Sequence, residues 1–431
     1  MIKRNYNLKS LLKWFYPGMR VKRFLLIVLV GIVFMAVGLI YVIDLTGFLW
    51  IKNQIKNLFI YYQIAPFFSG LILMFIGSLF IILGISNINR SILKIIIPKQ
   101  VDLLPEIIYE QRKLEKGPRI VVIGGGTGLY TLLRGLKQFT SNITAVVTAF
   151  DSGGSSGILR DELGVLPPGD IRNCLVALST EELLMKKLFQ YRFSNGSLKG
   201  HSFGNLFITA MSEVSGEFSK AVEKSSEILA IRGKVLPSSI EDVTLCARLK
   251  NKELIKGEDK IPQHKSEIES IFLEPSPVLP LPETIQAIQE ADLIILGPGS
   301  LYSSVICNLL VKGIPEKVCQ SPALKIYICN VMTQPGETDN YTAAMHVREI
   351  IKYLPENCLD YVVLNSQRLS KKVAAKYQQE DAFMVKDDLP PDLDKKTKII
   401  RQGLLSEYNF ARHHSEKLAK LILDIFHKEK K

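Results

Sequence analysis

The chain has 431 residues, a formal net charge of +12 and 47% hydrophobic residues. This length accommodates two ordinary domains, or one large domain with an extension. Seven of the positive charges lie in residues 1–23, which contain no acidic residue, and the remainder of the chain has mixed charge. Without a long basic stripe outside that tail, the composition argues against a nucleic-acid-binding protein.

The cysteines and histidines do not predict a metal site. The six cysteines lack the C-x-x-C spacing typical of metal ligands, and His413 and His414 have no matching cluster. We interpret the cysteines as buried thiols in a reducing compartment rather than as a disulfide framework. They are Cys174, Cys246, Cys307, Cys319, Cys329 and Cys358.

Two uncharged segments near the N-terminus have the length and composition of transmembrane helices. Residues 24–43 carry no charge, and a helix of that length can cross a hydrocarbon core of about 30 Å. A second uncharged run covers 57–89 and is most apolar from 66 to 85. A cleaved signal peptide would have a shorter apolar part, and a buried core helix would have a polar face. We therefore predict that residues 1–89 form a basic tail and two transmembrane helices.

The charges around these spans predict their orientation. Basic residues precede the first span and follow the second, whereas the connector holds two lysines and one aspartate. The bias predicts that both flanks are cytoplasmic. We expect a two-pass protein of the inner (cytoplasmic) membrane, with a juxtamembrane linker at residues 90–117 and a cytoplasmic α/β domain at residues 118–431.

Residues 119–157 have the pattern of a nucleotide-binding βαβ unit. A β-branched run at residues 119–123 breaks into the glycine turn 124–128, which precedes leucines at helical spacing. A second run, 143–150, ends in the glycine-serine turn 151–157. Glycine turns let backbone N–H groups approach a phosphate, and the helix that follows directs its positive end there. The pattern predicts a nucleotide or another phosphorylated ligand.

A tight turn without a ligand is the alternative for Gly124–Gly128 taken alone. The hydroxyl groups of Ser152, Ser155 and Ser156 favour a ligand, because a fold that needs only tight turns does not need them. Leu129 stands where a dinucleotide fingerprint has its third glycine. That departure, with no obvious proton donor, disfavours an NAD-dependent oxidoreductase.

The doubly wound pattern resumes after Pro280. A buried strand at 292–296 precedes the turn 297–304, and a strand at 325–330 precedes the turn 333–338. Turns that follow the strands of an open parallel sheet face its ligand crevice. We therefore predict a Rossmann-like, doubly wound, mostly parallel sheet in which four such turns converge on one site.

The segment between the two halves is predicted to be an insert. Its strands are expected near residues 234–236, 243–249 and 271–273, with a mobile polar hairpin at 250–266. A second surface loop is expected at 379–396. Neither loop carries a clear catalytic signal.

Seven runs of the chain together resemble a known family. They are Val121–Leu129, Asp151–Gly157, Pro168–Leu175, Tyr191–Phe193, Gly200–Phe207, Leu296–Ser304 and Tyr327–Thr338. These runs resemble the bacterial gluconeogenesis factor family, in the superfamily of the 2-phospho-L-lactate transferases of deazaflavin cofactor synthesis. The resemblance extends from residue 119 to the C-terminus. Soluble members of the family lack the N-terminal spans, so these bear on location rather than on chemistry.

The resemblance implies two possible functions. The favoured one is a regulator that binds a nucleotide sugar such as UDP-N-acetylglucosamine and links central carbon metabolism to cell-wall synthesis and cell shape, with cell-wall synthesis proteins as partners. The alternative is an enzyme that transfers a phospholactyl-type group from a nucleotide diphosphate to a deazaflavin acceptor, with Mg²⁺. Asp151 matches the transferases' acceptor-contacting aspartate, whereas Asp170 and Arg172 match loosely. No other cofactor is predicted, and a homo-oligomer is expected.

Three further residues have competing interpretations. Arg412 and His413 resemble the family's Arg-His pair before its last helix, where Arg412 could hold a phosphate, but His414 replaces the acidic residue that normally follows. His201 is either a capping residue or a ligand contact. Glu337 is either a catalytic or ribose-binding acid or a charge at a helix N-terminus.

The candidate site residues follow from these patterns. Asp151 and Asp170 are the candidate catalytic groups. The predicted ligand-binding residues are Gly124, Gly125, Gly126, Thr127, Gly128, Asp151, Ser152, Gly153, Gly154, Ser155, Ser156, Asp170, Arg172, Asn173, His201, Asn205, Gly297, Gly299, Ser300, Thr333 and Arg412.

Overall fold

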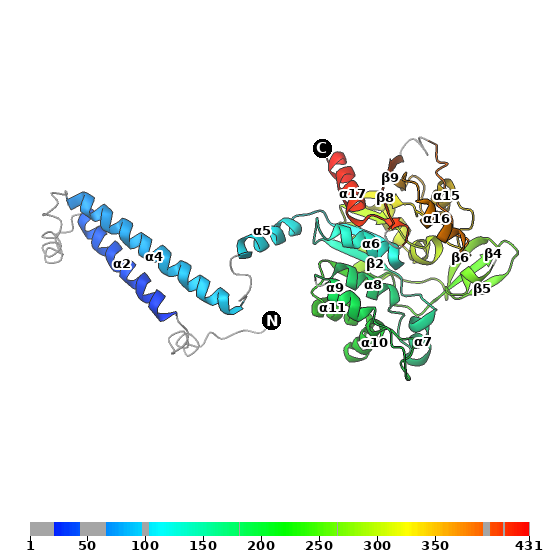
Figure 1. Ribbon diagram of the computed structural model, residues 1–431, viewed down its shortest axis with the longest axis horizontal. Coiled ribbons are helices and arrows are strands. Elements are labelled where there is room, and N and C mark those ends of the chain that lie inside the picture. Colours follow the sequence, from blue (N-terminus) through cyan, green and yellow to red (C-terminus); the bar gives the residue numbers. More distant parts are fainter. Residues whose placement is uncertain are drawn as a thin grey trace. The chain divides into compact units, whose positions relative to one another are not determined.

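The computed structural model of the protein describes residues 21–43, 66–96, 103–180, 182–264, 266–390, 397–407 and 410–430. The chain forms two compact units that divide between Glu110 and Gln111 (Figure 1). Most of the predicted basic tail and the predicted connector between the spans lie outside the described residues.

The first unit contains two helices that are long and apolar enough to cross a membrane, α2 (Lys22–Ile43) and α4 (Pro66–Ile96). They pack through glycines. A Cβ atom on Gly31 would lie 2.7 Å from the carbonyl oxygen of Gly77, and the reverse substitution would be equally close. Small residues at a helix contact allow close approach, as is common between helices in lipid. The composition of the two predicted spans therefore corresponds to two closely packed helices.

The predicted linker is largely helical. α4 continues past residue 89, the predicted end of the second span, to Ile96, and α5 (Leu104–Glu115) follows it. The end of α5 is attached to the second unit, because Ser141 donates its backbone N–H to the carbonyl oxygen of Leu114 at 3.0 Å.

The second unit is built on a seven-stranded parallel sheet in the order β10-β9-β8-β7-β1-β2-β3. Its strands read as nearly continuous apolar runs because they are covered on both faces. In β1, for example, Val121 and Ile123 join one core while Ile120 and Val122 join the other. The strands are β1 (Ile120–Gly124), β2 (Ile143–Val147), β3 (Lys234–Pro237), β7 (Leu293–Leu296), β8 (Leu324–Ile328), β9 (Tyr361–Asn365) and β10 (Lys398–Gln402).

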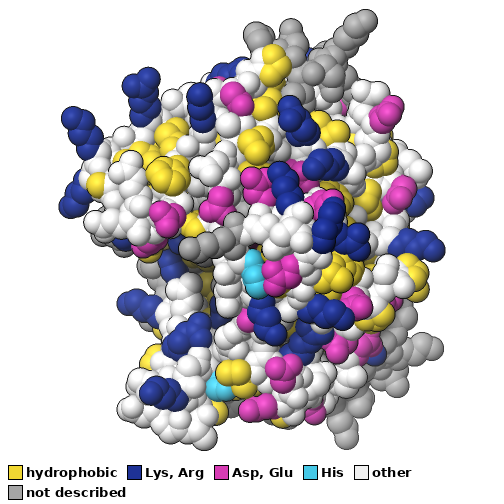
Figure 2. Space-filling model, turned by 90° about the vertical axis from the view of Figure 1, so that its right-hand side faces the viewer, with side chains coloured by type: hydrophobic (Ala, Val, Ile, Leu, Met, Phe, Trp, Pro, Cys, Tyr) yellow, Lys and Arg dark blue, Asp and Glu magenta, His cyan; other side chains and the backbone are white. Residues whose placement is uncertain are grey.

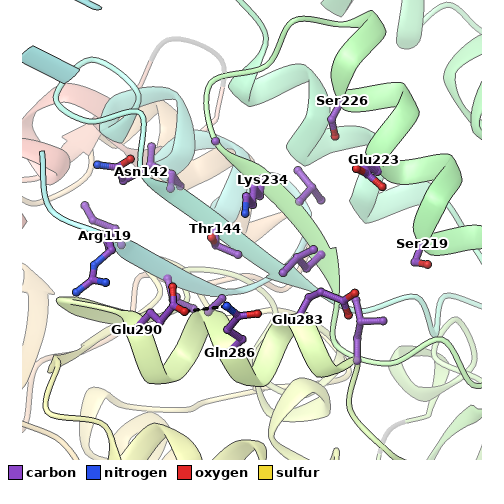
Figure 3. A pocket seen from close by; sticks show the side chains of 18 of the residues that line it. Arg119, Asn142, Thr144, Ser219, Glu223, Ser226, Lys234, Glu283, Gln286 and Glu290 are labelled. Carbon is purple, nitrogen blue, oxygen red and sulfur yellow. Dashed lines mark hydrogen bonds between the residues drawn. The ribbon is translucent and has the colours of Figure 1, made fainter. Parts of the chain in front are cut away.

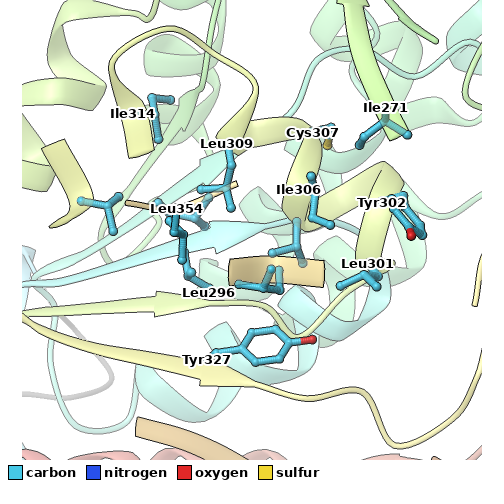
Figure 4. Packing of buried hydrophobic residues seen from close by; sticks show 14 of the residues in the cluster. Ile271, Leu296, Leu301, Tyr302, Ile306, Cys307, Leu309, Ile314, Tyr327 and Leu354 are labelled. Carbon is cyan, nitrogen blue, oxygen red and sulfur yellow. The ribbon is translucent and has the colours of Figure 1, made fainter. Parts of the chain in front are cut away.

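Helices cover each face of this sheet. Those that pack on the core of Ile120 and Val122, here called the first core (the core of Val121 and Ile123 being the second), are α6 (Gly126–Leu136), α8 (Gly169–Leu178), α9 (Glu182–Phe189), α10 (Phe203–Ser215), α11 (Phe218–Ile228) and α17 (Ser415–Glu429). Those on the second core are α12 (Pro282–Glu290), the π-helical turn η5 (Leu301–Ile306), α13 (Cys307–Leu309), α14 (Ile314–Gln320) and α15 (Ala343–Lys352). Figure 4 shows the second core, where Tyr302 and Ile306 of η5 lie among apolar side chains of the sheet and the insert.

Shorter elements complete the second unit. They are α7 (Gly154–Leu163), η4 (Ile261–Gln263), α16 (Lys371–Gln378), β11 (Leu405–Ser406) and β12 (Arg412–His413). α16 was not predicted, since none of its residues is buried and its apolar side is limited to the partly buried Val373 and Tyr377.

The insert differs from its prediction in one strand. It is a three-stranded antiparallel sheet of β4 (Thr244–Leu249), β5 (Leu254–Lys256) and β6 (Ile268–Glu274). The strand predicted at 234–236 is β3, which pairs with β2 at the edge of the main sheet instead. Part of the polar run 250–266 forms β5 and η4 and is therefore ordered.

The interpretation of the cysteines as six free thiols is wrong for one pair. Cys319 in α14 and Cys358 before β9 form a disulfide, with their Cα atoms 5.0 Å apart. The fold brings together two cysteines that are 39 residues apart and belong to no spacing motif. The other four cysteines are free and buried.

Candidate functional site

The strand order creates a ligand crevice between β1 and β7. The chain proceeds outward from β1 to β2 and β3, and then returns to place β7 on the other side of β1. At such a switch point the turns after the two strands diverge and leave a crevice. Here the two turns touch at one point, where a Cβ atom on Gly299 would lie 2.9 Å from the carbonyl oxygen of Gly125, and residues of both turns line the crevice beside this contact.

Two glycines determine the shape of the first turn. Gly126 has φ of +64°, a conformation that residues with a side chain adopt at a cost. Gly128 lies against the neighbouring turn, where a Cβ atom would be 2.6 Å from the carbonyl oxygen of Pro298. The turn thus directs the N-terminus of α6 toward the crevice, and an anion is stabilised at such a helix terminus.

The crevice has a volume of about 320 Å³ and lies over β1, β7 and β8. Asn330, after β8, joins its walls: its side-chain Nδ2 donates to the carbonyl oxygen of Gly299 at 2.7 Å, and its Oδ1 accepts from the Gly299 N–H at 3.3 Å. Thr333 pairs with Phe383 through its backbone N–H and its hydroxyl group. The volume is at the lower end of the range for small-ligand sites.

The C-terminal region supplies the outer wall of the crevice. Arg412 is exposed and lines it, with its guanidinium group 5.2 Å from the ring centroid of Phe410. Tyr377 of α16 also lines it and accepts the Ala411 N–H at 3.0 Å. His413 is buried, and burial lowers its pKa to about 4. At neutral pH, Arg412 is therefore the cation of this wall and His413 is uncharged.

Three carboxyl groups lie beside the glycine turn, at the ends of β1 and β2. Asp170 accepts the Gly126 N–H, and a Cβ atom on Gly125 would lie 2.0 Å from its Oδ2. Burial, followed by the charge of Asp151, raises the pKa of Asp170 to about 7. Burial, again followed by the charge of Asp151, raises the pKa of Glu258 to about 8. Burial also raises the pKa of Asp151. At neutral pH this cluster of three carboxyl groups therefore retains protons that carboxyl groups with ordinary pKa values would have lost.

The loop after β5 brings Glu258 to this group. The carboxylate of its neighbour Asp259 accepts a hydrogen bond from the Ser152 hydroxyl at 2.5 Å, and the Asp259 N–H donates to the Ser152 hydroxyl oxygen at 3.2 Å. Gly336 packs against the next part of the loop, since a Cβ atom there would meet the Pro262 carbonyl oxygen at 2.0 Å. The loop therefore packs over the ends of β2 and β8.

Arg172 organises the polar side of the site. Its guanidinium group donates to Ser202 Oγ and Asn205 Oδ1, each at 2.7 Å, and to Asn173 Oδ1 at 3.1 Å. Asn205 in turn donates to the hydroxyl groups of Ser155 and Ser156, both at 3.2 Å. The predicted serine donors are thus held in a network of protein hydrogen bonds.

His201 belongs to the same network, because its Nδ1 and the Ser155 hydroxyl are hydrogen bonded at 3.1 Å. It caps no helix, since the N-cap of α10 is Ser202. Glu337 accepts from the Ser303 hydroxyl at 2.8 Å and from backbone N–H groups of Tyr302 and Ser303. Its carboxyl group therefore lies at a helix N-terminus, that of η5, and burial raises its pKa.

The predicted site residues fall into two adjoining sets. One set lines the crevice: Gly126, Thr127, Gly128, Gly299, Ser300, Thr333 and Arg412. A second set, which does not line it, comes from the turn after β2, from α7 and α8, and from α10 with the loop before it: Asp151, Ser152, Gly153, Gly154, Ser155, Ser156, Asp170, Arg172, Asn173, His201 and Asn205. Gly124, Gly125 and Gly297 form the floor where the two turns meet.

Four contributors escaped the sequence analysis. Asn330 directly follows a buried strand, so its place at the carboxyl end of β8 was a usable signal. Tyr377 lies on the unpredicted helix α16, and Glu258 and Asp259 lie in a polar loop of the insert. No local pattern marks these three residues as part of the site.

The described residues contain no group of three or more His, Cys, Asp or Glu side chains placed to hold a metal ion. A larger hollow, of about 660 Å³, lies elsewhere, near the amino-terminal parts of β1, β2 and β3 (Figure 3). Its wall mixes Arg119 and Lys234 with Glu223 and Glu283, so it has no single charge preference. We place the candidate site in the smaller crevice, because glycine turns and a helix N-terminus converge there.

Comparison with known proteins identifies close relatives. The sequence model of the 2-phospho-L-lactate transferase CofD family matches residues 120–405. The gluconeogenesis factor of Bacillus subtilis is 47% identical over 310 residues, which cover 72% of this chain and 98% of that protein. The "Putative gluconeogenesis factor" of Clostridium acetobutylicum is 44% identical over 423 residues, covering 95% of this chain and 91% of that protein. Its similarity therefore includes much of the N-terminal unit.

A solved structure is similar over the second unit. The crystal structure of a UPF0052 family member from Bacillus halodurans has a TM-score of 0.69 and 45% sequence identity, and it covers 72% of this chain and 99% of that chain. The sheet and its flanking helices are thus an architecture shared with proteins that lack the first unit.

Proposed function

Because the chain belongs to the family of the gluconeogenesis factors, within the wider 2-phospho-L-lactate transferase CofD family, we propose that it is a membrane-anchored regulator that binds a nucleotide sugar resembling UDP-N-acetylglucosamine. In this role it links central carbon metabolism to cell-wall synthesis and cell shape, with proteins of cell-wall synthesis as its partners.

The observation that carries the proposal is the pairing of α6 with Arg412 across one crevice. Gly126 and Gly128 direct the N-terminus of α6 into it, and the exposed Arg412 guanidinium lines the other wall. A helix N-terminus favours an anion, and a guanidinium group binds phosphate oxygens in a bidentate manner. A diphosphate between them would satisfy both.

The remaining wall suits the neutral ends of such a ligand. Tyr377 and Phe410 offer aromatic surface to a base, and the side chains of Thr333, Gln334 and Glu380 offer hydrogen-bonding groups to sugar hydroxyls. Aromatic side chains stack on bases of any kind, so this wall supports a nucleotide without specifying uracil.

A transferase is the second candidate, and Asp170 is the observation in its favour. Its pKa of about 7, beside the glycine turn, is suited to a general base or acid at neutral pH. The transferase would move a phospholactyl-type group from a nucleotide diphosphate to a deazaflavin. If the transfer required Mg²⁺, Asp151 and Asp170 would be the candidate residues to hold it, and the ion would supply positive charge to the diphosphate.

The proposed membrane anchor rests on α2 and α4. Both helices expose large apolar side chains, among them Leu26 at 63% and Phe75 at 73%, and their glycine contact is of a kind favoured in lipid. With basic residues before α2 and after α4, the proposed topology is a hairpin with both ends in the cytoplasm. On the face of the protein in Figure 2, basic and acidic side chains are interspersed, which supports a small-molecule ligand over a nucleic acid.

Isothermal titration calorimetry of the full-length protein in nanodiscs tests the assignment. We expect UDP-N-acetylglucosamine to bind, and GDP and NAD not to bind. Arg412→Gln should weaken binding by ten- to a hundredfold, since a charge-assisted hydrogen bond contributes about 1.5–3 kcal/mol. The matched control is Arg368→Gln, an exposed arginine outside the crevice. Binding of GDP together with a deazaflavin, without the UDP sugar, would replace the regulator by the transferase.

A further inference from the structure

The helix α5 joins the first unit to the second and leaves an apolar stripe exposed. Leu103 is 58% exposed, Ile107 40% and Ile108 43%, while Leu104 is half-buried. We infer that α5 lies flat on the cytoplasmic surface of the membrane and that lipid covers this stripe. The inference rests on the proposed anchor and deepens it, since it assigns a second membrane contact to the chain.

The stripe is that of an interfacial helix. Residues 103, 104, 107 and 108 share one side of a helix with 3.6 residues per turn, and Glu106 and Lys113 lie on the other side. Interfacial helices combine such a narrow apolar stripe with a charged face and low net hydrophobicity, and they bury the stripe about 5–10 Å into the headgroup boundary. The side of α5 opposite the stripe is too polar for this helix to cross the membrane.

The position of α5 in the chain specifies lipid as the occupant. Only seven residues, 97–103, separate α5 from the end of α4 at Ile96. A chain of that length spans at most about 25 Å, so α5 starts close to the point where α4 leaves the bilayer. Lys and Arg residues near an anionic surface add an electrostatic attraction to it.

The basic residues of this region lie where they can contact headgroups. Lys94 is in the last turn of α4, and Arg112 and Lys113 are in the last turn of α5. The acidic Glu106 is in the first turn of α5, where it complements the helix dipole. Basic side chains therefore lie before the exposed stripe, at Lys94, and after it, at Arg112 and Lys113, where Glu110 and Glu115 accompany them.

The far end of α5 transmits this contact to the cytoplasmic domain. Leu114 is buried, and its carbonyl oxygen accepts from the Ser141 N–H at 3.0 Å. Asn142 donates its side-chain amide to the carbonyl oxygens of Glu115 at 2.7 Å and Gly117 at 2.8 Å. These bonds attach α5 to the segment that precedes β2.

Site-directed spin labelling of the full-length protein in nanodiscs containing anionic lipid tests the inference. Nitroxides are placed singly at Ile107→Cys and Ile108→Cys in the stripe, at Glu106→Cys on the charged side, and at Phe75→Cys on α4, and their collision rates with oxygen and with a water-soluble nickel chelate are measured. Unmutated protein treated with the same reagent gives the background, which should be low because the free cysteines are buried.

The labels at Ile107 and Ile108 should be several-fold more accessible to oxygen than to the chelate, at a depth of about 5–10 Å. The label at Glu106 should show the opposite preference. If the label at Phe75 lies deep in the bilayer while the labels at Ile107 and Ile108 are as accessible to the chelate as the label at Glu106, α4 spans the membrane but α5 does not lie on it. Exclusion of both reagents from Ile107 and Ile108 would overturn the inference in favour of a protein partner or a second copy. A label at Phe75 in water would overturn the anchor and the interfacial helix together.

Discussion

The carboxyl groups of Asp151 and Glu258 are hydrogen bonded to each other, although the two residues come from different sheets of the protein. Such a bond requires a proton on one of the two groups. It therefore connects the loop of the insert to the end of β2 only while that proton is held.

This proton makes the stability of the protein depend on pH. The pKa of Glu258 is raised to about 8 in the folded protein, whereas an unfolded glutamate has a pKa of about 4.3. Stability from this group is fully present below the unfolded value and is lost as the pH rises through about 8. Glu258→Gln, which donates without titrating, should flatten that decline, by roughly 1–3 kcal/mol between pH 5 and 8.5. Urea unfolding at a series of pH values measures it. Glu316→Gln, an exposed control, should leave the slope as in the wild type, and an unchanged slope in Glu258→Gln would refute the shared proton.

Gly126→Ala should remove ligand binding without removing the fold. The new Cβ has room, with Ser304 Oγ its nearest neighbour at 3.8 Å, but φ of +64° is strained for alanine. The strain should cost about 1–2 kcal/mol and move the backbone that faces the ligand. Gly164→Ala is a matched control, because Gly164 has φ of +65°, open surroundings and a place outside the crevice. Both variants should lose similar stability by thermal unfolding, and only Gly126→Ala should lose affinity by calorimetry. Equal affinity in the two would return the turn to a purely structural role.

Local patterns predicted the nucleotide unit because its information is local. The apolar strand β1, the turn at Gly126 and the leucines of α6 are consecutive, so periodicity and turn chemistry identify them together. Asp170 was predicted as a site residue, and it lies in the first turn of α8. Glu258 and Tyr377 could not be placed, because Glu258 reaches the site through an insert and Tyr377 through a short helix with little apolar surface. The pairing of cysteines across 39 residues is likewise a property of the fold alone.

Asp170 should make the affinity for an anionic ligand depend on pH. Its pKa is about 7, and its carboxyl group accepts the Gly126 N–H at the turn where we place the phosphates. A neutral Asp170 tolerates a diphosphate better than an ionised one, so affinity should fall as the pH rises from 6 to 8. A charge about 4 Å away in water costs roughly 1 kcal/mol, or about a fivefold change. Asp170→Asn should keep the hydrogen bond and remove the pH dependence in calorimetric titrations. A variant that loses affinity at every pH would instead make Asp170 a direct or metal-mediated ligand contact.

His414 acts as the N-cap of α17 in place of the acidic residue that the family resemblance leads one to expect. Its Nδ1 accepts the Lys417 N–H at 3.5 Å, a long bond for a cap. His414→Asp should shorten this bond and add a negative charge at the helix N-terminus. Together these should raise the free energy of unfolding by about 0.5–1 kcal/mol. His427→Asp makes the same exchange in the last turn of the same helix, where the dipole disfavours an acid, so it should destabilise. Urea unfolding that gives the two variants the same sign would disprove the capping role.

Asp151→Asn separates the regulator from the transferase. Asp151 follows β2 and is one of the three clustered carboxyl groups beside the glycine turn. A Cβ atom on Gly169 would lie 2.6 Å from its Oδ2. Asparagine keeps this shape and can donate to Glu258, but it cannot accept a proton from an attacking hydroxyl or hold a cation. For a protein that only binds, we expect a loss of affinity for UDP-N-acetylglucosamine of at most ten- to a hundredfold, the roughly 1.5–3 kcal/mol of a charged hydrogen bond. That affinity should not depend on Mg²⁺ in either protein.

A transferase would use Asp151 to orient or deprotonate the acceptor, or to hold Mg²⁺ beside the diphosphate. If the wild type releases a nucleoside monophosphate with Mg²⁺ and a deazaflavin, and Asp151→Asn does not, the proposal of a regulator is wrong. Chromatographic analysis of the nucleotides after incubation with each protein decides between the two, and we expect the wild type to leave them intact.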